Sequence, residues 1–284
     1  MMNLSQWKAA QKRFIFEGEE IAYWTAGEGS PLLLIHGFPT SSFDWVPIWE
    51  ALSARHQVFA CDLLGFGLSA KPKDGYSIHR QADLQEAFLR EAQINKADLL
   101  VHDYGVSVGQ ELLARQNQDE LSFQLDQLLF LNGGIFPGEH RPRPIQKLGA
   151  SPLGFLVSLL TNRQRFGKSF SEVFGPDTQP MPEELDAYWD LICAHGGKWI
   201  MHKLLGYMKD RERHKDRWIS ALSPNQDRIG LINGALDPVS GKHVFDVWQR
   251  TLPQARAHLL EHVGHYPQVE DPHAVASKVL EWLA

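Results

Sequence analysis

The chain has 284 residues, 43% of them hydrophobic and 22% charged, a composition typical of a packed globular protein that excludes disorder as its main state. Its 28 lysine and arginine residues against 34 aspartate and glutamate residues give a net charge of −6, which argues against nucleic acid or an anionic membrane surface as its main partner. The sequence has no apolar run of about 18 residues that could span a membrane.

Cysteine usage points to a reducing compartment. Cys61 and Cys193 are too few for a disulfide framework, and no Cys-x-x-Cys pair indicates zinc. The N-terminal segment has no apolar run, so we expect no signal peptide and a cytoplasmic protein. His262 and His265 lie three residues apart without a third ligand, so no metal site is predicted.

Over the first 135 residues, short apolar runs alternate with longer amphipathic segments. Residues 13–16 and 21–25 are predicted to form a hairpin. The continuous apolar run at 31–35 is typical of a strand that is covered on both faces, as in a parallel sheet. Further strands are expected at 58–61, 99–101 and 128–131, with helices at 41–54, 79–93 and 105–115.

The alternation stops at about residue 136, and from there to about residue 220 the sequence has helical periodicity and no convincing strand. Strands resume at 229–232 and 257–260, each followed by a helix, at 243–251 and 272–283. We therefore predict an α/β protein with a mostly parallel, doubly wound sheet of eight strands. Its core comprises residues 1–135 and 221–284, and a helical cap, residues 136–220, is inserted after the sixth strand.

Polar motifs follow four of the predicted strands, at the edge where open α/β sheets bind ligands. The first, His36-Gly37-Phe38-Pro39, follows the strand at 31–35. Gly37 permits a tight turn, so the backbone N–H of Phe38 can point into a pocket as half of an oxyanion hole. The alternative is an ordinary loop between a strand and a helix.

The second motif, His102-Asp103-Tyr104-Gly105, follows the strand at 99–101. A residue between a strand end and a helix start, with a glycine two positions later, sits on a sharp turn that presents a nucleophile at a helix N-terminus. Here that residue is Asp103, and a carboxylate can attack carbon to form an ester.

A serine close to this turn offers a competing interpretation. Residues 105–109 read Gly-Val-Ser-Val-Gly and match the nucleophile motif G-x-S-x-G around Ser107. For Ser107 to occupy the turn, however, the strand would have to continue through residues 102–105, beyond its apolar run. We therefore favour Asp103 as the nucleophile and expect Ser107 in the first turn of the following helix.

The third and fourth motifs supply an acid and a histidine. Asp237 follows the strand at 229–232, and His265 follows the strand at 257–260. Each motif alone is weak, because Asp-Pro is usually a turn and a lone histidine is usually structural. The order nucleophile, acid, histidine is that of α/β-hydrolase triads, so together they predict a triad of Asp103, Asp237 and His265.

The chain resembles the α/β-hydrolase superfamily over nearly its whole length. Within it, His-Gly-Phe-Pro, His-Asp-Tyr-Gly and Gly-His-Tyr-Pro-Gln-Val-Glu-Asp-Pro look like the epoxide hydrolase and haloalkane dehalogenase branch, whose nucleophile is aspartate. Longer segments resemble the mesoderm-specific transcript protein group. They are His102-Asp103-Tyr104-Gly105, Gln110-Glu111-Leu112-Leu113, Asn132-Gly133-Gly134-Ile135-Phe136-Pro137, His140-Arg141-Pro142, Val173-Phe174-Gly175-Pro176 and His265-Tyr266-Pro267-Gln268.

This resemblance implies a reaction in two steps. Asp103 attacks an electrophilic carbon and becomes an alkyl ester, and His265, held by Asp237, activates the water that hydrolyses it. The backbone N–H groups of Phe38 and Tyr104 would stabilise the oxyanion. No cofactor and no metal is implied.

The residues beside the nucleophile favour an epoxide over a halide. Haloalkane dehalogenases usually have tryptophan after the nucleophile and often asparagine after His-Gly, where this chain has Tyr104 and Phe38. Epoxide hydrolases use cap tyrosines, which are neutral at pH 7 and can donate to a developing alkoxide. Tyr207, which precedes a basic stretch and Trp218, is the stronger candidate and Tyr188 the weaker; both could instead only pack within the cap.

We therefore expect an epoxide hydrolase that opens a small or medium apolar substrate with water as its second substrate. His36, Tyr188 and Trp189 are further candidates for contact with the substrate. Three alternatives stay open: a haloalkane dehalogenase, another hydrolase of this fold such as an esterase, and a non-catalytic binding protein. The sequence leaves the actual substrate and the oligomeric state undecided.

Overall fold

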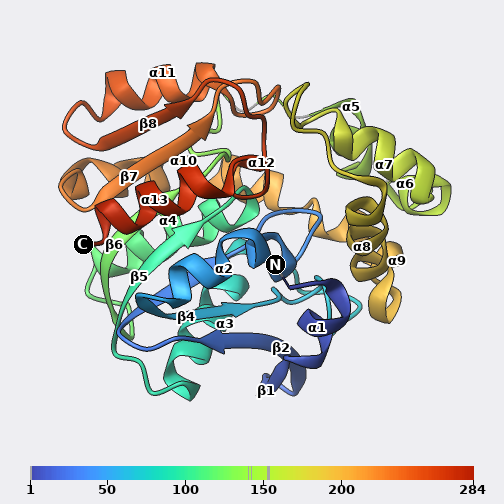
Figure 1. Ribbon diagram of the computed structural model, residues 1–284, viewed down its shortest axis with the longest axis horizontal. Helices are drawn as coiled ribbons and strands as arrows, with labels where there is room; N and C mark the ends of the chain where they lie inside the picture. The colour runs from blue at the N-terminus through green and yellow to red at the C-terminus, as the bar shows by residue number, and fades with distance from the viewer. Residues whose placement is uncertain (1, 140, 142, 152–153) are drawn as a thin grey trace.

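The computed structural model describes residues 2–139, 141, 143–151 and 154–284, which form one eight-stranded sheet with helices on both faces (Figure 1). Its strand order is β1-β2-β4-β3-β5-β6-β7-β8. β2 is antiparallel to both of its neighbours, and all the other neighbouring strands are parallel. The predicted mostly parallel, doubly wound sheet is therefore confirmed. The strands are β1 Lys12–Phe16, β2 Glu19–Ala26, β3 Ser30–Ile35, β4 His56–Cys61, β5 Lys96–Val101, β6 Gln124–Phe130, β7 Ile229–Gly234 and β8 Arg256–Leu260.

The central strand β3 is apolar at successive positions because each face of the sheet has its own core. Leu33 and Ile35 belong to one core, whereas Leu32 and Leu34 belong to the other. Successive side chains of a strand point to opposite faces, so a strand covered on both faces reads as a continuous apolar run. The first core is covered by α3 Ile78–Glu91, α4 Tyr104–Gln116, α10 Tyr207–Leu222 and α11 Lys242–Thr251, and the second by α1 Leu4–Ala9, α2 Val46–Ser53 and α13 Pro272–Trp282.

Between β6 and β7, the described residues form helices and turns and no strand, as predicted for the insertion. Figure 1 places α5 to α9 in a group beside the sheet. The helix α10 differs, because it packs along α4, where the indole N–H of Trp218 donates to Glu111 at 2.8 Å. The predicted cap limits, 136–220, stay a prediction. The helices beside the sheet are α5 Pro144–Gly149, α6 Gly154–Leu160, α7 Arg163–Ser171, α8 Pro182–Cys193 and α9 Gly197–Leu204.

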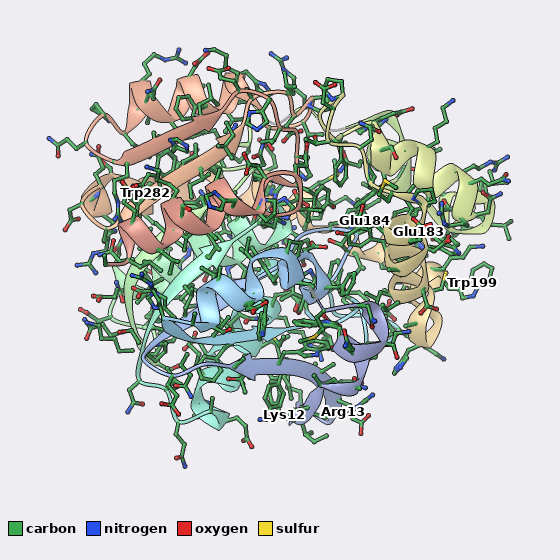
Figure 2. All side chains as sticks on the ribbon, in the orientation of Figure 1. Lys12, Arg13, Glu183, Glu184, Trp199 and Trp282 are labelled. Atoms are coloured by element: carbon green, nitrogen blue, oxygen red, sulfur yellow. The ribbon has the colours of Figure 1, made fainter. Side chains whose placement is uncertain are left out.

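The outer side of this group carries both charged and aromatic side chains. Figure 2 shows Glu183 and Glu184 of α8 and Trp199 of α9 at its edge, and Trp199 is exposed. Across the described residues, every helix is too short or too polar to span a bilayer. Of the segment His140-Arg141-Pro142, only Arg141 lies within the described residues.

Two glycines allow the loops at the carboxyl edge of the sheet to approach each other closely. A Cβ atom at Gly105 would lie 2.3 Å from the carbonyl oxygen of Ile35, and one at Gly37 would lie 2.8 Å from the Cβ of Asp103. Both distances are far shorter than an ordinary van der Waals contact. The turn between β5 and α4 therefore rests directly on the end of β3.

We expect Gly105→Ala to lower the free energy of unfolding by about 1–3 kcal/mol, because the added methyl group meets backbone atoms that cannot rotate away. Urea unfolding measures the change. Gly138→Ala is the matched control, since a Cβ there has no heavy atom within 4 Å. The control should change stability by less than about 0.5 kcal/mol, and equal stability of the two variants would contradict the argument.

Candidate active site

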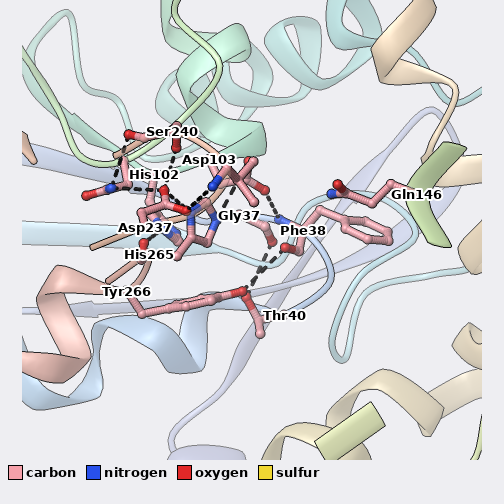
Figure 3. A network of polar contacts seen from close by, with 12 residues as sticks. Gly37, Phe38, Thr40, His102, Asp103, Gln146, Asp237, Ser240, His265 and Tyr266 are labelled. Carbon is pink, nitrogen blue, oxygen red and sulfur yellow. Dashed lines mark hydrogen bonds and ion pairs between the residues drawn. The ribbon is translucent and has the colours of Figure 1, made fainter. Parts of the chain in front are cut away.

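Four loops at the carboxyl edge of the sheet bring the predicted site residues together (Figure 3). Phe38 follows β3, Asp103 lies between β5 and α4, Asp237 follows β7 and His265 follows β8. The three titratable side chains are almost fully buried, with exposed fractions of 3% for Asp103, 3% for Asp237 and 5% for His265. The residues that were predicted because they follow strand ends therefore lie close together in space.

Asp103 occupies a strained turn. Its backbone angles are φ 42° and ψ −97°, a positive φ that residues other than glycine rarely adopt. The N–H of Asp103 donates to the carbonyl oxygen of Asn132 at 2.9 Å, and the N–H of Gly105 donates to that of His36 at 3.1 Å. Neighbouring loops thus hold the backbone on both sides of the turn.

The carboxylate of Asp103 has two distinct oxygens. The backbone N–H of Phe38 donates to Oδ2 at 3.0 Å. Oδ1 lies 4.0 Å from Nε2 of His265 and 3.8 Å from the guanidinium of Arg211, which is too far for a hydrogen bond to either. One oxygen is therefore held by the loop after β3, while the other makes only longer-range ionic contacts.

His265 is oriented by Asp237. Nδ1 of His265 donates to Oδ2 of Asp237 at 2.7 Å. Asp237 also accepts from the N–H of Val239 at 2.7 Å, the hydroxyl of Ser240 at 2.6 Å and the side-chain amide of Asn132 at 3.0 Å. With these donors the buried Asp237 carboxylate is satisfied, and it fixes the imidazole with Nε2 toward Asp103.

Burial and charge act against each other on all three groups. Burial would raise the pKa of Asp103, but the charges of His265 and Arg211 hold it below its usual range. Burial would likewise raise the pKa of Asp237, and the charge and hydrogen bond of His265 hold it well below the ordinary carboxylate value. For His265, burial would lower the pKa, yet Asp237 raises it to about 9. At neutral pH the site therefore holds an imidazolium between two carboxylates.

His102 supports the backbone of His265 and was not predicted to do so. Its Nε2–H donates to the carbonyl oxygen of His265 at 2.8 Å. Burial lowers the pKa of His102 to about 3, so the ring is neutral. Asn132 and Ser240, which hold Asp237, were missed as well. These roles arise from contacts between distant parts of the chain, and no local pattern signals them.

A cavity of about 320 Å³ opens onto Asp103 and His265. Its wall is mostly apolar, with a few polar side chains from the helices beside the sheet. Such a lining suits an apolar small molecule. The cavity is lined by Phe38, Pro39, Asp103, Arg143, Gln146, Leu148, Val157, Leu160, Thr161, Arg165, Phe166, Ser169, Phe170, Val173, Met201, Leu205, Val239, His265 and Tyr266.

His36 cannot serve as the predicted substrate contact. It is fully buried, and the N–H of Leu63 donates to its Nε2 at 3.0 Å, while its Nδ1 lies 2.9 Å from the carbonyl oxygen of Gly37. Both ring nitrogens are therefore occupied within the protein. His36 instead ties the loop after β3 to the loop after β4, and this corrects the prediction.

The three predicted cap aromatics lie behind the wall of this cavity, each against a phenylalanine that lines it. Among the described residues that line it, Tyr207, Tyr188 and Trp189 do not occur. Tyr207 packs against Tyr104, with ring centroids 5.0 Å apart, and its hydroxyl has no hydrogen-bond partner in the described part of the chain. Tyr188 is buried against Phe170, and Trp189 contacts Phe166. The structure gives all three a packing role.

Ser107 lies in the first turn of α4, as the sequence indicates, and is fully buried. Its hydroxyl accepts from Nε of Arg211 at 2.7 Å. It does not line the cavity, and within the described residues its hydroxyl is bonded to Arg211 instead of His265. The G-x-S-x-G match therefore has no nucleophile geometry here. Across the described residues, no group of three or more His, Cys, Asp or Glu side chains is arranged to hold a metal ion.

Comparison with known proteins agrees with this arrangement. The model of the alpha/beta hydrolase family matches residues 32–278. The mesoderm-specific transcript protein of Mus musculus is 40% identical over 282 residues, which cover 95% of this chain and 84% of that protein. This chain belongs to the alpha/beta hydrolase family. The predicted resemblance is thereby confirmed, and hydrolysis is the class of reaction that this family indicates.

Relatives of known reaction are also similar to this α/β hydrolase. A soluble epoxide hydrolase of Corynebacterium sp. is 34% identical over 133 residues, 46% of this chain and 45% of that protein. The crystal structure of haloalkane dehalogenase DbeA from Bradyrhizobium elkani has the same fold, with a TM-score of 0.78 and 22% identity, over 96% of this chain and 97% of that one.

We expect Asp237→Asn to lower the pKa of His265 from about 9 by about 1–3 pH units, because it removes the charge that opposes the effect of burial. NMR titration of the imidazole measures this. The control is Asp271→Asn, which removes the partner of the exposed His262 and should leave His265 unchanged.

Asp237→Asn should also change how the free energy of unfolding depends on pH. The pKa of His265 lies above its ordinary value of 6.5, so the contribution of the His265–Asp237 pair is fully present below pH 6.5 and is lost as the pH rises through about 9. The gap in unfolding free energy between wild type and Asp237→Asn should therefore narrow over this range. A gap that widens with pH would contradict the charge assignment.

Proposed function

We propose that this α/β hydrolase opens epoxides to diols through a covalent ester on Asp103. This proposal is based on the different surroundings of the two oxygens of that carboxylate. Oδ2 already accepts from the N–H of Phe38, while Oδ1 faces His265 and accepts no hydrogen bond from the described residues. Asp103 and His265 both line the apolar cavity, so Oδ1 is available to attack a bound substrate.

In the first step, Oδ1 of Asp103 forms a bond to a ring carbon and the carbon–oxygen bond of the ring breaks, with the electron pair staying on the ring oxygen. His265, protonated because of its raised pKa, supplies the proton that converts this alkoxide to an alcohol. Asp103 loses its charge on becoming an ester. One of the charges that raised the pKa of His265 is then gone, which leaves a neutral imidazole suited to act as a base.

In the second step, neutral His265 takes a proton from water, and the hydroxide oxygen attacks Cγ of Asp103. The charge that collects on Oδ2 is held by the N–H of Phe38, which is already in contact with this oxygen, and by the N–H of Tyr104. The bond between Cγ and Oδ1 then breaks. Oδ1 leaves with the product and takes the proton of the attacking hydroxyl, which restores the Asp103 carboxylate and the imidazolium.

Gln146 is our candidate to assist the ring oxygen, in place of Tyr207. It lines the cavity, and Figure 3 shows its amide turned toward the side of Phe38 and Asp103. Its Oε1 accepts from the N–H of Arg143 at 2.8 Å, so its Nε2–H group is the end left for a substrate. A neutral amide donor at this position can bind an alkoxide as it forms.

A trapped intermediate tests the reaction class. His265→Gln removes both the acid of ring opening and the base of ester hydrolysis. Ring opening should then be slow, with the alkoxide taking its proton from water, while the ester is no longer hydrolysed. Prolonged incubation with styrene oxide or 1,2-epoxyhexane should therefore add the mass of the whole epoxide, mapped to Asp103 by peptide sequencing. The matched control Ser107→Ala, combined with His265→Gln, should still form the adduct, whereas Asp103→Asn should form none. With Asp103→Asn alone, turnover should fall by at least about 10³-fold.

Other outcomes of this experiment exclude the proposal. With 1-bromohexane, a mass increase of the haloalkane minus hydrogen bromide, in the absence of an epoxide adduct, would identify a dehalogenase. An acyl group on Ser107 from an ester substrate would identify an esterase. In wild type, a single turnover in ¹⁸O-labelled water should leave the label in Asp103 and not in the diol, because Oδ1 is the atom transferred.

The two steps should depend on pH in opposite directions. Ring opening uses the Asp103 carboxylate and the imidazolium, so its rate should be constant between the lowered pKa of Asp103 and the His265 pKa of about 9, and fall about tenfold per pH unit above the latter. Ester hydrolysis uses the neutral base, so its rate should rise with pH, with a midpoint below 9. Quenched-flow mass spectrometry separates the steps, and ring opening that rises through pH 9 would be incompatible with an imidazolium donor.

Gln146→Leu should slow ring opening by about 10- to 1,000-fold and leave hydrolysis of the preformed ester nearly unchanged. Gln146→Glu is the matched variant, since it keeps the acceptor for the N–H of Arg143 but lacks the donor. The rate of ring opening should fall to a similar extent in both variants. Normal ring opening in Gln146→Leu would show that Gln146 only lines the cavity.

A further inference from the structure

The proposed mechanism gives no task to a buried charge that lies next to Asp103, the guanidinium of Arg211. Arg211 lies on α10, which packs against α4, the helix that begins directly after Asp103 (Figure 1). Only 3% of Arg211 is exposed, and it does not line the cavity. A fully desolvated cation is rare in proteins unless specific partners compensate for its burial.

Those partners belong to the nucleophile turn. The NH2 group of Arg211 donates to the backbone carbonyl of Asp103 at 2.7 Å, and its Nε donates to the hydroxyl of Ser107 at 2.7 Å. Its guanidinium carbon also lies 4.5 Å from the centre of the Tyr207 ring. These contacts explain why Ser107 and Tyr207 are buried near the turn without reaching the cavity: both help to seat this guanidinium.

The same guanidinium supplies charge to the nucleophile. Its NH2 lies 3.8 Å from Oδ1 of Asp103. Among the described residues, His265 from the loop after β8 and His102 from the end of β5 act on the charge of Asp103, with Asp237 acting through His265. Burial keeps four further groups near Asp103 neutral, because it lowers the pKa of His36 and raises the pKa values of Asp44, Tyr207 and Tyr266. His102 is neutral, and His265 gives up its proton in the proposed cycle. Arginine keeps its charge at every physiological pH, so Arg211 is the constant cation beside this carboxylate.

The hydrogen bond from Arg211 to the carbonyl of Asp103 also stabilises the strained backbone of the turn. A positive φ at a residue other than glycine persists only where the surroundings hold it in place. The N–H of Asp103 is held by Asn132 and its carbonyl by Arg211, so the two ends of the strained peptide segment are anchored to different elements. Asn132 lies two residues after the end of β6, whereas Arg211 comes from α10, far along the chain.

We infer that Arg211 is a positioning residue for the nucleophile: it clamps the carbonyl of the Asp103 turn and places a permanent positive charge beside the attacking carboxylate. This inference rests on the proposed role of Asp103. It assigns to α10 a direct part in the chemistry, whereas the sequence analysis assigned this helix to the cap. It also predicts that charge and clamping can be separated by substitution.

Arg211→Met removes both the hydrogen bond to the Asp103 carbonyl and the positive charge. The test measures the titration of the Asp103 carboxylate itself. In protein labelled with ¹³C at aspartate Cγ, the Asp103 signal is identified by its absence from Asp103→Asn. Asp103 should titrate about 1–3 pH units higher in Arg211→Met than in wild type. The acid limb of the ring-opening rate with styrene oxide should move upward by the same amount.

Arg211→Lys separates the two functions. The ammonium keeps the charge, so Asp103 should titrate close to its wild-type position. It cannot donate to the Asp103 carbonyl and the Ser107 hydroxyl in the fixed geometry of a guanidinium, so ring opening should still be slower than in wild type. The matched control is Arg217→Met on the same helix, which loses its bond to Glu111 at 2.9 Å and should leave the titration of Asp103 unchanged.

The outcomes distinguish this inference from the proposed function. An unchanged Asp103 titration in folded Arg211→Met would overturn the inference even if wild type opens epoxides. A raised titration in a protein that forms no epoxide adduct would support Arg211 and reject the epoxide reaction. If Arg211→Met does not fold, as judged by circular dichroism, Arg211→Gln provides the test, since it removes the charge and keeps a polar N–H donor.

Discussion

A buried carboxylate stays ionised only when positive charge and hydrogen-bond donors surround it, and Asp103 imposes this requirement on the whole site. The N–H of Phe38 binds one of its oxygens, while His265 and Arg211 bring charge from two different elements. His265 depends in turn on Asp237, whose own burial is compensated by three further donors. Each buried charge of the site is therefore stabilised by a neighbouring group that is itself stabilised by further contacts.

The fold meets this requirement by bringing four loops into close contact. Gly105 lets the turn after β5 rest on the end of β3, and Gly37 lets the loop after β3 reach the Asp103 carboxylate. The helix α10 completes the arrangement, because its Arg211 reaches the turn from the opposite end of the inserted segment. The apolar cavity then opens onto an electrostatic arrangement that is already in place before any substrate binds.

Local sequence patterns were sufficient for the residues that follow strand ends. Asp103, Asp237 and His265 were placed correctly near one another because parallel strands bring their carboxyl ends to one edge of the sheet. Ser107 was set aside by the length of the apolar run before it, and it lies inside α4. The same patterns failed for His36, whose ring nitrogens are both used within the protein, and for Tyr207, which packs behind Phe38 and does not line the cavity.

The sequence by itself determined the sheet class, the insertion after the sixth strand and the positions of Asp103, Asp237 and His265 at strand ends, because periodicity and strand ends are local properties of the chain. Only the tertiary structure decided which side chains line the cavity, that Gln146 reaches it, and that Arg211 lies behind Asp103. The contacts of Arg211 join residues 104 and 108 positions apart. Such contacts depend on how α10 packs against α4. This packing arises from the shapes of the side chains, which cannot be deduced from the periodicity of hydrophobic residues in the sequence.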